Sequence, residues 1–249
     1  MTRPKLVRLD RILVERGLAP SRQRARELIE SGRVMIDGLV VRKASTQFRP
    51  DRPLRLTSEE HVWVGRGAQK LLGALRVLPM EVEGHRCADL GASTGGFSEV
   101  LLQRGAQRVY AIDVGRGQLH RRVATDPRVV VMDGTNVRHL VGLPESVDRI
   151  VGDLSFISLT KILPAVGRLL SDGGEALLLI KPQFEAGRGG VNRRGRVKDE
   201  GVRREAIEQV RSDAQALGFE ILGGEDCTLP GAKSGNVEYF VWLRFPTAR

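Results

Sequence analysis

The sequence predicts an α/β protein whose larger part is a mostly parallel, doubly wound sheet of seven strands, preceded by a small α+β domain. Three observations support this prediction. Short apolar strands alternate with helices from about residue 67 to the C-terminus. The first of these strands runs into a glycine-rich loop, C-A-D-L-G-A-S-T-G-G-F at 87–97. Residues 1–60 form a separate compositional zone with 14 Lys+Arg against 8 Asp+Glu, which is +6 of the total net charge of +10.

Composition excludes several classes of protein. The 249 residues suffice for a large and a small domain, and 41% hydrophobic with 28% charged residues is typical of a soluble globular chain. The longest apolar runs, such as 176–180, are too short to span a bilayer, and the N-terminus has no apolar signal core. We therefore expect a cytoplasmic protein. Cys87, Cys227 and four scattered histidines predict neither disulfides nor a metal site.

Two short helices are predicted at the N-terminus. The first lies in L-D-R-I-L-V-E-R-G and stops at Gly17. The second lies in S-R-Q-R-A-R-E-L-I-E-S-G, for which Ser21 is a typical N-cap. Each helix has one apolar face, and the residues of these two faces are Leu9, Ile12, Leu13, Ala25, Leu28 and Ile29.

A hairpin follows the two helices, because apolar residues 34–36 and 39–41 flank the turn Asp37-Gly38. This arrangement resembles the RNA-binding module of ribosomal small-subunit protein four, many pseudouridine synthases and some tRNA synthetases. The motifs that match are L-D-x-x-L, R-G-L, S-R-x-x-A-x-x-L-I, G-x-V and D-G. A helix-turn-helix reader of DNA is the alternative, which the hairpin disfavours, and a merely basic helical hairpin is a third. The resemblance implies RNA binding through Arg8, Arg11, Arg22, Arg24 and Arg26.

Residues 49–66 predict a last strand of this domain and a linker, with Pro50 and Pro53 as breakers. We expect the RNA-binding domain to cover 1–60, the linker 61–64 and the second domain 65–249.

The second domain alternates strands and helices. Its predicted strands are 86–90, 108–112, 129–132, 149–153, 176–180, 220–227 and 237–245, and its predicted helices are about 67–75, 96–103, 119–124, 159–170 and 200–217. Only the short segment 229–236 joins the last two strands, so they must pair antiparallel. A parallel sheet closed by one reversed strand is the Rossmann-like core that is usual in methyltransferases.

The glycine-rich loop predicts a nucleotide pocket. A loop between a strand and a helix N-terminus lets backbone N–H groups face a ligand. Against the dinucleotide fingerprint G-x-G-x-x-G, Gly91 and Gly96 fit, but the middle position is Ser93. A cofactor without a pyrophosphate is therefore favoured. The loop residues predicted to contact it are Gly91, Ser93, Gly95, Gly96 and Phe97.

Acids end three successive strands beside this loop. Asp89 is placed to accept from an ammonium group, Asp113 to accept both ribose hydroxyls and Asp133 to reach an adenine amino group. Each alone is as compatible with a simple strand-end cap. Together they favour S-adenosyl-L-methionine, which has the ammonium that NAD lacks, with NAD as the weaker alternative.

Four further residues suggest the chemistry. Lys181 follows a buried strand, Asp153 ends the neighbouring strand, Lys70 lies on the first helix of the domain and Glu238 starts the last strand. They match the K-D-K-E tetrad of the FtsJ-like ribose 2′-O-methyltransferases. With G-R-G-A-x-K-L, D-L-G-A-S-T-G-G-F, D-x-S-F-I-S-L and K-P-Q-F-E in order, nearly the whole chain resembles the TlyA family. That resemblance implies methylation of cytidine 2′-hydroxyls in 16S or 23S ribosomal RNA, or in both.

The predicted reaction needs a hydroxyl aligned with a methyl group and relieved of its proton. We assign Lys181 the proton-accepting or hydroxyl-steering role, Asp153 its orientation, and Glu238 the placement of Lys70 or of the ribose. Phe156 is either core or a stacking partner for a flipped base. Neither a Pro-Cys nucleophile nor an Asn/Asp-Pro-Pro-Tyr motif of other transferases is present.

A second basic region follows the catalytic lysine. Residues 186–204 hold seven Lys/Arg against two acids, and a solvated surface loop is the plain alternative to phosphate binding. The candidate contacts to ribosomal RNA or ribosomal subunits are Arg188, Arg193, Arg194 and Arg196. The linker departs from the family pattern R-x-W-V, because His61 replaces the arginine. Two other functions stay open: a non-catalytic ribosome-assembly factor and, with no apolar span to support it, a pore-forming haemolysin.

Overall fold

The structure, a computed structural model, describes residues 6–37, 39–56, 63–187, 189–192, 194–231 and 235–247, without the side chains of 39 and 40. The chain divides into two compact units, Met1–Val62 and Trp63–Arg249. Trp63 and Val64, which the sequence assigns to a linker, therefore fall within the second unit, where both pack against its core. The position His61 lies outside the described residues.

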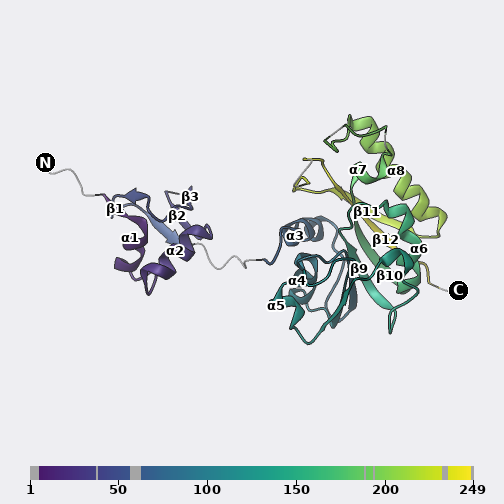
Figure 1. The fold of residues 1–249 in the computed structure, drawn as a ribbon, viewed down its shortest axis with the longest axis horizontal. Coiled ribbons are helices and arrows are strands. Elements are labelled where there is room, and N and C mark those ends of the chain that lie inside the picture. The colour runs from purple at the N-terminus through teal and green to yellow at the C-terminus, as the bar shows by residue number, and fades with distance from the viewer. Residues whose placement is uncertain are drawn as a thin grey trace. The chain divides into compact units, whose positions relative to one another are not determined.

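The first unit contains the two predicted helices and the predicted hairpin (Figure 1). The Ser21 hydroxyl caps the second helix by accepting from the backbone N–H of Arg24 at 3.2 Å, and Gly17 ends the first helix with φ +69°. Gly38 of the turn is outside the described residues. The elements are β1 (Val7–Arg8), α1 (Leu9–Glu15), α2 (Arg22–Glu30), β2 (Val34–Ile36), β3 (Leu39–Val41), β4 (Gln47–Phe48) and β5 (Leu54–Leu56). β2 lies between β3 and β5, and β1 pairs with β4.

The second unit is built on one seven-stranded sheet with the order β11-β12-β10-β9-β6-β7-β8. Neighbours from β10 to β8 run parallel, whereas β12 is antiparallel to both β10 and β11. The predicted methyltransferase-type sheet is thus confirmed. Its strands are β6 (Arg86–Leu90), β7 (Arg108–Asp113), β8 (Val129–Asp133), β9 (Val147–Gly152), β10 (Leu170–Ile180), β11 (Glu220–Asp226) and β12 (Tyr239–Arg244).

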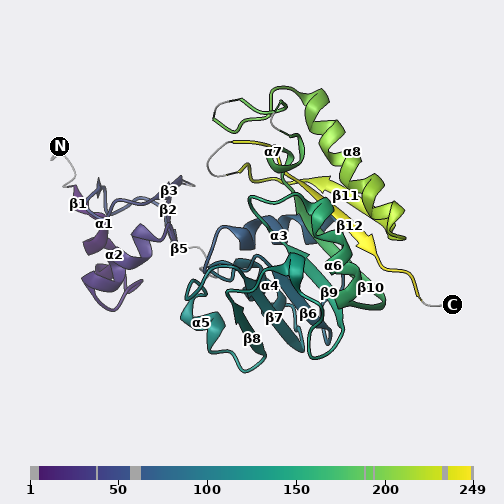
Figure 2. The ribbon, with the colours of Figure 1, turned by 45° about the vertical axis from the view of Figure 1, so that its right-hand side comes forward.

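Helices cover both faces of this sheet (Figure 2). On one face lie α3 (Gly67–Val77), α4 (Gly96–Gln103) and α5 (Arg121–Ala124). On the other lie α6 (Leu163–Leu169) and α8 (Glu200–Ala216). The strands in the middle are buried on both sides, which is why their sequences are continuous apolar runs rather than alternating ones. Because β6 runs parallel to both β7 and β9, the carboxyl ends of these three strands meet at a single edge of the sheet.

The structure differs from the sequence prediction between residues 159 and 185. The single predicted helix 159–170 is a 3₁₀ turn, η2 (Leu159–Lys161), followed by α6, which has Pro164 in its first turn. Proline lacks an N–H and fits the start of a helix rather than its interior, so the chain restarts there. β10 begins at Leu170, and its register shifts before Glu175. In addition, the short elements η1 (Val137–His139) and α7 (Pro182–Glu185) of the second unit, and β1 and β4 of the first, were not predicted.

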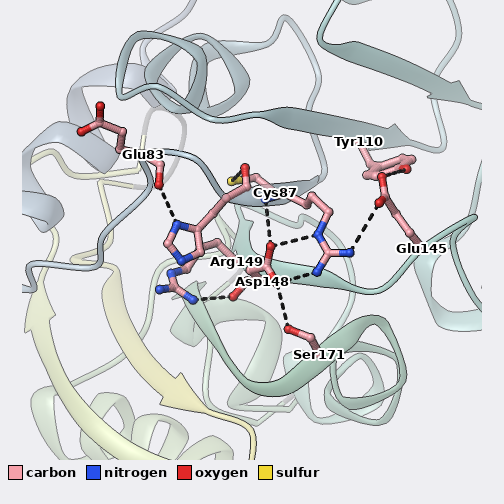
Figure 3. A network of polar contacts seen from close by, with 9 residues as sticks. Glu83, Cys87, Tyr110, Glu145, Asp148, Arg149 and Ser171 are labelled. Carbon is pink, nitrogen blue, oxygen red and sulfur yellow. Dashed lines mark hydrogen bonds and ion pairs between the residues drawn. The ribbon is translucent and has the colours of Figure 1, made fainter.

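A polar network centred on Arg86 joins the amino ends of β6, β7 and β9. Figure 3 labels its members Asp148, Glu145, Tyr110 and Ser171. Both the backbone N–H and the guanidinium of Arg86 donate to Asp148, at 2.8 to 3.0 Å, and Ser171 donates to the same carboxylate at 3.1 Å. The Tyr110 hydroxyl donates to Glu145, which also pairs with Arg86. The hydrogen bond from Arg86 lowers the pKa of Asp148 to about 2, against the opposing effect of burial. This network lies at the edge opposite the candidate active site.

Replacing Asp148 with asparagine is expected to remove an acid-sensitive part of the stability. A carboxyl whose pKa is depressed in the folded state stabilises the fold above its unfolded value of 3.8, and this contribution disappears as the pH falls towards 2. The difference in unfolding free energy between wild type and Asp148→Asn should therefore shrink between pH 4 and pH 2, in urea titrations at several pH values. A difference that stays constant over this range would contradict the assignment.

Candidate active site

The loop between β6 and α4 has the backbone that its glycines predict. Gly91 has φ +84°, and a Cβ there would lie 3.2 Å from the carbonyl oxygen of Asp153. Gly95 has φ +93° and is the N-cap of α4, and a Cβ on Gly96 would lie 2.9 Å from the nitrogen of Ala68. Ser93, at the fingerprint's middle glycine, also adopts a left-handed conformation, with φ +47°. The loop keeps the shape of a nucleotide-binding turn, but a side chain projects where a pyrophosphate would need bare backbone.

Two cavities open beside this loop. The larger has a volume of about 460 Å³ and includes Asp113 and Asn136 in its lining, and the smaller, of about 200 Å³, is lined in part by Lys181 and Phe97. Their volumes together are in the range of small-molecule pockets. The residues that line both cavities are Gly91, Ser93, Asp153 and Ser155. The cavities therefore adjoin at the carboxyl ends of β6 and β9.

The three strand-end acids differ in position. Asp113 lines the larger cavity, and its two oxygens accept from the backbone N–H groups of Ser93 at 2.8 Å and Gly115 at 2.7 Å. Asp133 accepts from the N–H of Gly117 at 2.7 Å and is not among the lining residues. Asn136, three residues after Asp133, lines the larger cavity instead. The structure thus brings Asp113 to the pocket but not Asp133.

Asp89 is completely buried behind the loop. One of its oxygens accepts from the backbone N–H and the hydroxyl of Ser98, at 2.8 and 2.7 Å. The other has no hydrogen-bond partner among the described residues. Burial raises the pKa of Asp89 to about 7. A cation near that oxygen would favour the ionised form, which is the property expected of an ammonium-binding carboxylate.

The predicted catalytic tetrad is assembled in one connected cluster. The Lys70 ammonium lies 2.6 Å from Glu238 and 3.4 Å from Asp153, and the Lys181 ammonium lies 2.6 Å from the other oxygen of Asp153. Asp153 therefore bridges the two lysines. Lys181 and Glu238 are buried, while Asp153 faces both cavities. Residues 70, 153, 181 and 238, which are far apart in sequence, meet at the carboxyl edge of the sheet.

The electrostatics of the cluster are balanced. Burial by itself would lower the pKa of Lys70, but the charge of Asp153 and the hydrogen bond to Glu238 outweigh this effect, and the pKa of Lys70 is raised. Lys70 therefore stays protonated and serves as a fixed positive charge. Lys181, whose ammonium also donates to the Ser155 hydroxyl at 2.7 Å, is the tetrad lysine that lines the smaller cavity.

Ser155 is among the residues of this site that sequence reasoning missed. Ser155 lines both cavities and accepts from Lys181, yet in D-L-S-F it carries no signal beyond its nearness to Asp153. The neighbouring Phe156 has φ +65°, is 85% exposed and lies 5.3 Å from the ring of Phe184. The structure therefore rules out the core position for Phe156, and the stacking role remains a prediction.

In the first unit, the five predicted arginines fall into two groups. Arg8, Arg22 and Arg26 all pair with Asp10, which is completely buried, at 3.0, 3.0 and 3.5 Å. The hydrogen bond from Arg8 and the charge of Arg22 hold the pKa of Asp10 well below its usual range, although burial opposes them. The other two, Arg11 and Arg24, pair with exposed carboxylates on their own helices. A buried carboxylate thus gathers three half-exposed guanidinium groups at one place.

The basic loop after α7 forms a small hairpin. The Asn192 side chain accepts from the backbone N–H groups of Arg194 and Arg196, at 2.9 and 3.0 Å, and Val191 pairs with Val197. Both arginines are exposed. Arg188 and Arg193 lie outside the described residues.

The fold, the paired cavities and the lysine–carboxylate cluster define the second unit as a methyltransferase of the Rossmann-like class. Sequence comparison gives the family. The FtsJ-like methyltransferase family matches residues 63–245, and the S4 domain matches residues 7–52. The chain belongs to the FtsJ-like methyltransferases and, within them, to the TlyA family.

Three relatives illustrate this membership. A 16S/23S rRNA (cytidine-2′-O)-methyltransferase TlyA from Mycobacterium tuberculosis is 50% identical over 97% of this chain and 91% of its own. Hemolysin A from Brachyspira hyodysenteriae is 35% identical over 94% of this chain and 98% of its own. A solved structure of a hemolysin-named protein from Streptococcus thermophilus has a TM-score of 0.73 and 34% identity, covering 98% of this chain and 90% of that one. Within the described ranges, no helix combines the length and apolar character needed to cross a membrane.

Proposed function

We propose that this protein transfers a methyl group from S-adenosyl-L-methionine to the ribose 2′-hydroxyl of cytidine in ribosomal RNA, 16S, 23S or both. The observation that carries the proposal is the connected cluster of Lys70, Asp153, Lys181 and Glu238, which reaches the cavities through Asp153 and Lys181. The name of the Mycobacterium tuberculosis relative supports the cytidine and both RNAs as targets.

The residues of the larger cavity fit the proposed cofactor. Asp113 offers a carboxylate to ribose hydroxyls, and Gly91 lines the same cavity without a side chain to fill it. Asp89 is completely buried and is not among the residues that line either cavity, but its unpartnered oxygen, behind the loop, is an acceptor of the kind that an ammonium group needs. When bound, the cofactor supplies an electrophilic methyl group, so the protein has only to activate and align the acceptor.

The tetrad supplies this activation. A ribose hydroxyl is a weak nucleophile until its proton is drawn away. Lys181 lines the smaller cavity, and we assign it the steering of the 2′-oxygen or the uptake of its proton. Asp153 fixes Lys181 from one side while its other oxygen is held by Lys70. Glu238 anchors Lys70 and so completes the chain of contacts.

The proposal is tested by incubating the purified protein with radiolabelled S-adenosylmethionine and ribosomal subunits that lack 2′-O-methyl groups, followed by mapping of the modified nucleotides. Label on a cytidine ribose in 16S or 23S RNA is the expected result. Binding to subunits without transfer of label would instead support a non-catalytic assembly factor. Leakage of dye from liposomes with no transfer of label would support the haemolysin alternative.

The arginines of the first unit are expected to contribute unequally to RNA binding. The double variant Arg22→Ala/Arg26→Ala removes two of the guanidinium groups gathered by Asp10. The matched control, Arg11→Ala/Arg24→Ala, removes the same charge from groups already neutralised by helix partners. Each lost phosphate contact makes the fall of log K with log salt less steep by about 1. The first variant should therefore reduce the steepness by about 2, and the control by less. Filter binding over a salt series measures both, and equal slopes for the two variants would contradict the expectation.

A further inference from the structure

The two segments that carry Asp153 and Lys181 of the tetrad are joined at a second point away from the chemistry. Residues 153–159 follow β9 and residues 181–185 follow β10. At their beginnings they are linked by Lys181, which contacts Asp153 and Ser155. At their ends they are linked by Glu185, whose carboxylate accepts from the Ser158 hydroxyl at 2.5 Å and from the backbone N–H of Leu159 at 2.9 Å.

The Glu185 carboxylate is not needed merely to cap a helix. It is the last residue of α7, and the 3₁₀ turn η2 that it reaches is already capped by Ser158, whose hydroxyl accepts from the N–H of Thr160 at 3.2 Å. Burial raises the pKa of Glu185, against the effect of its two hydrogen bonds. Burying an acid costs free energy unless its partners are held in place. The group therefore links two segments in a way that the local cap does not.

The segment between the two links is conformationally strained. Phe156 has a positive φ of +65°, which is costly for an aromatic residue, and its ring is mostly exposed beside the larger cavity. Such a conformation persists only when its surroundings hold it. Here Ser155 is held by Lys181 on one side, and Ser158 is held by Glu185 on the other. Phe184, on the same short helix as Glu185, lies against Phe156.

We infer that Glu185 is a positioning residue for methyl transfer: it holds the segment 153–159 so that Asp153 and Ser155 face Lys181. The inference rests on the proposed function and extends it to a residue outside the tetrad. It also gives the motifs D-x-S-F-I-S-L and K-P-Q-F-E a shared role, because each supplies one half of both links.

The test compares Glu185→Ala with Glu185→Gln in the full-length protein. Alanine removes both hydrogen bonds, so the segment relaxes and the single-turnover rate should fall about 10- to 100-fold, as displacements near 1 Å do elsewhere. Glutamine can accept from the N–H of Leu159 and donate to Ser158, so it should recover the rate to within about threefold of wild type. The KM for RNA should change little in either variant, because the basic surfaces are untouched.

Asp148→Asn is the matched control for a purely structural effect. The Asp148 carboxylate also accepts from a backbone N–H and a serine hydroxyl, but at the opposite edge of the sheet. The Asp148→Asn variant should have a lower melting temperature but an unchanged rate of methyl transfer. If Glu185→Ala does not fold, Ser158→Ala removes one of the two partners and should show a smaller fall in rate.

The inference is overturned if a folded Glu185→Ala or Ser158→Ala variant transfers methyl groups at the wild-type rate. It is equally overturned if Glu185→Gln is as slow as Glu185→Ala, since the negative charge itself would then be required. Either result leaves the proposed function intact. Absence of methyl transfer by the wild-type protein, in contrast, defeats the proposed function.

Discussion

Replacing Lys181 with alanine is expected to lower the single-turnover rate of methyl transfer by about 100- to 10,000-fold, the range that a positioned proton acceptor contributes. The reason is geometric. Lys181 is the tetrad lysine that lines the smaller cavity, and its ammonium is held by Asp153 at 2.6 Å and Ser155 at 2.7 Å. Without Lys181, no group of the cluster steers the 2′-oxygen, whereas the residues of the larger cavity, where the cofactor is proposed to bind, are unchanged.

The variant should remain folded. Loss of Lys181 leaves Asp153 still paired with Lys70, so no buried carboxylate loses its only partner. The measurement is quenched-flow transfer of label at saturating RNA and cofactor, with cofactor binding measured separately by calorimetry. Lys161→Ala, which removes an exposed lysine from η2, is the control for loss of a positive charge in the same unit. Full methyl transfer by Lys181→Ala with cofactor binding intact would refute the assignment of Lys181.

Helices and strands that are marked by a run or a regular repeat of apolar residues were predicted well. The strand 86–90 and the helix 96–103 have the bounds that the apolar run and the glycine loop indicate. The tetrad could also be placed, because Asp153 and Lys181 directly follow buried strands of one parallel sheet. Strand ends and loop glycines are local signals, so a single sequence is enough to find them.

Long-range side-chain contacts could not be predicted in the same way. Nothing local in K-P-Q-F-E indicates that Glu185 binds Ser158, 27 positions earlier in the chain. Nor does L-D-R indicate that Asp10 is buried among arginines from another helix. The position of Asp133 depends on the path of the loop after β7, because the backbone N–H of Gly117 in that loop donates to the Asp133 carboxylate. Such contacts are decided by tertiary packing, and only coordinates reveal them.

Replacing Asp113 with alanine is expected to raise the dissociation constant for S-adenosylmethionine at least about 100-fold. Hydrogen bonds to a charged group contribute about 1.5–3 kcal/mol each, so the loss of two ribose contacts corresponds to about 3 to 6 kcal/mol, which is roughly two to four orders of magnitude. The carboxylate also holds the N–H groups of Ser93 and Gly115, so its removal loosens both sides of the pocket. Calorimetric titration of the apoprotein measures the change, and thermal unfolding checks that the fold survives.

Asp133→Ala makes this prediction discriminating. The sequence pattern treats Asp113 and Asp133 alike, as acids at the ends of neighbouring strands, whereas only Asp113 lines the cavity. If the structure ranks the two correctly, Asp133→Ala should weaken cofactor binding by no more than about threefold, since it loses a single exposed hydrogen bond to Gly117. Equal losses in the two variants would mean that Asp133 reaches the adenine after all, and that the loop carrying Gly117 moves when the cofactor binds. If only Asp113→Ala greatly weakens cofactor binding, the Asp113 carboxylate is the main polar group that holds the ribose of the cofactor.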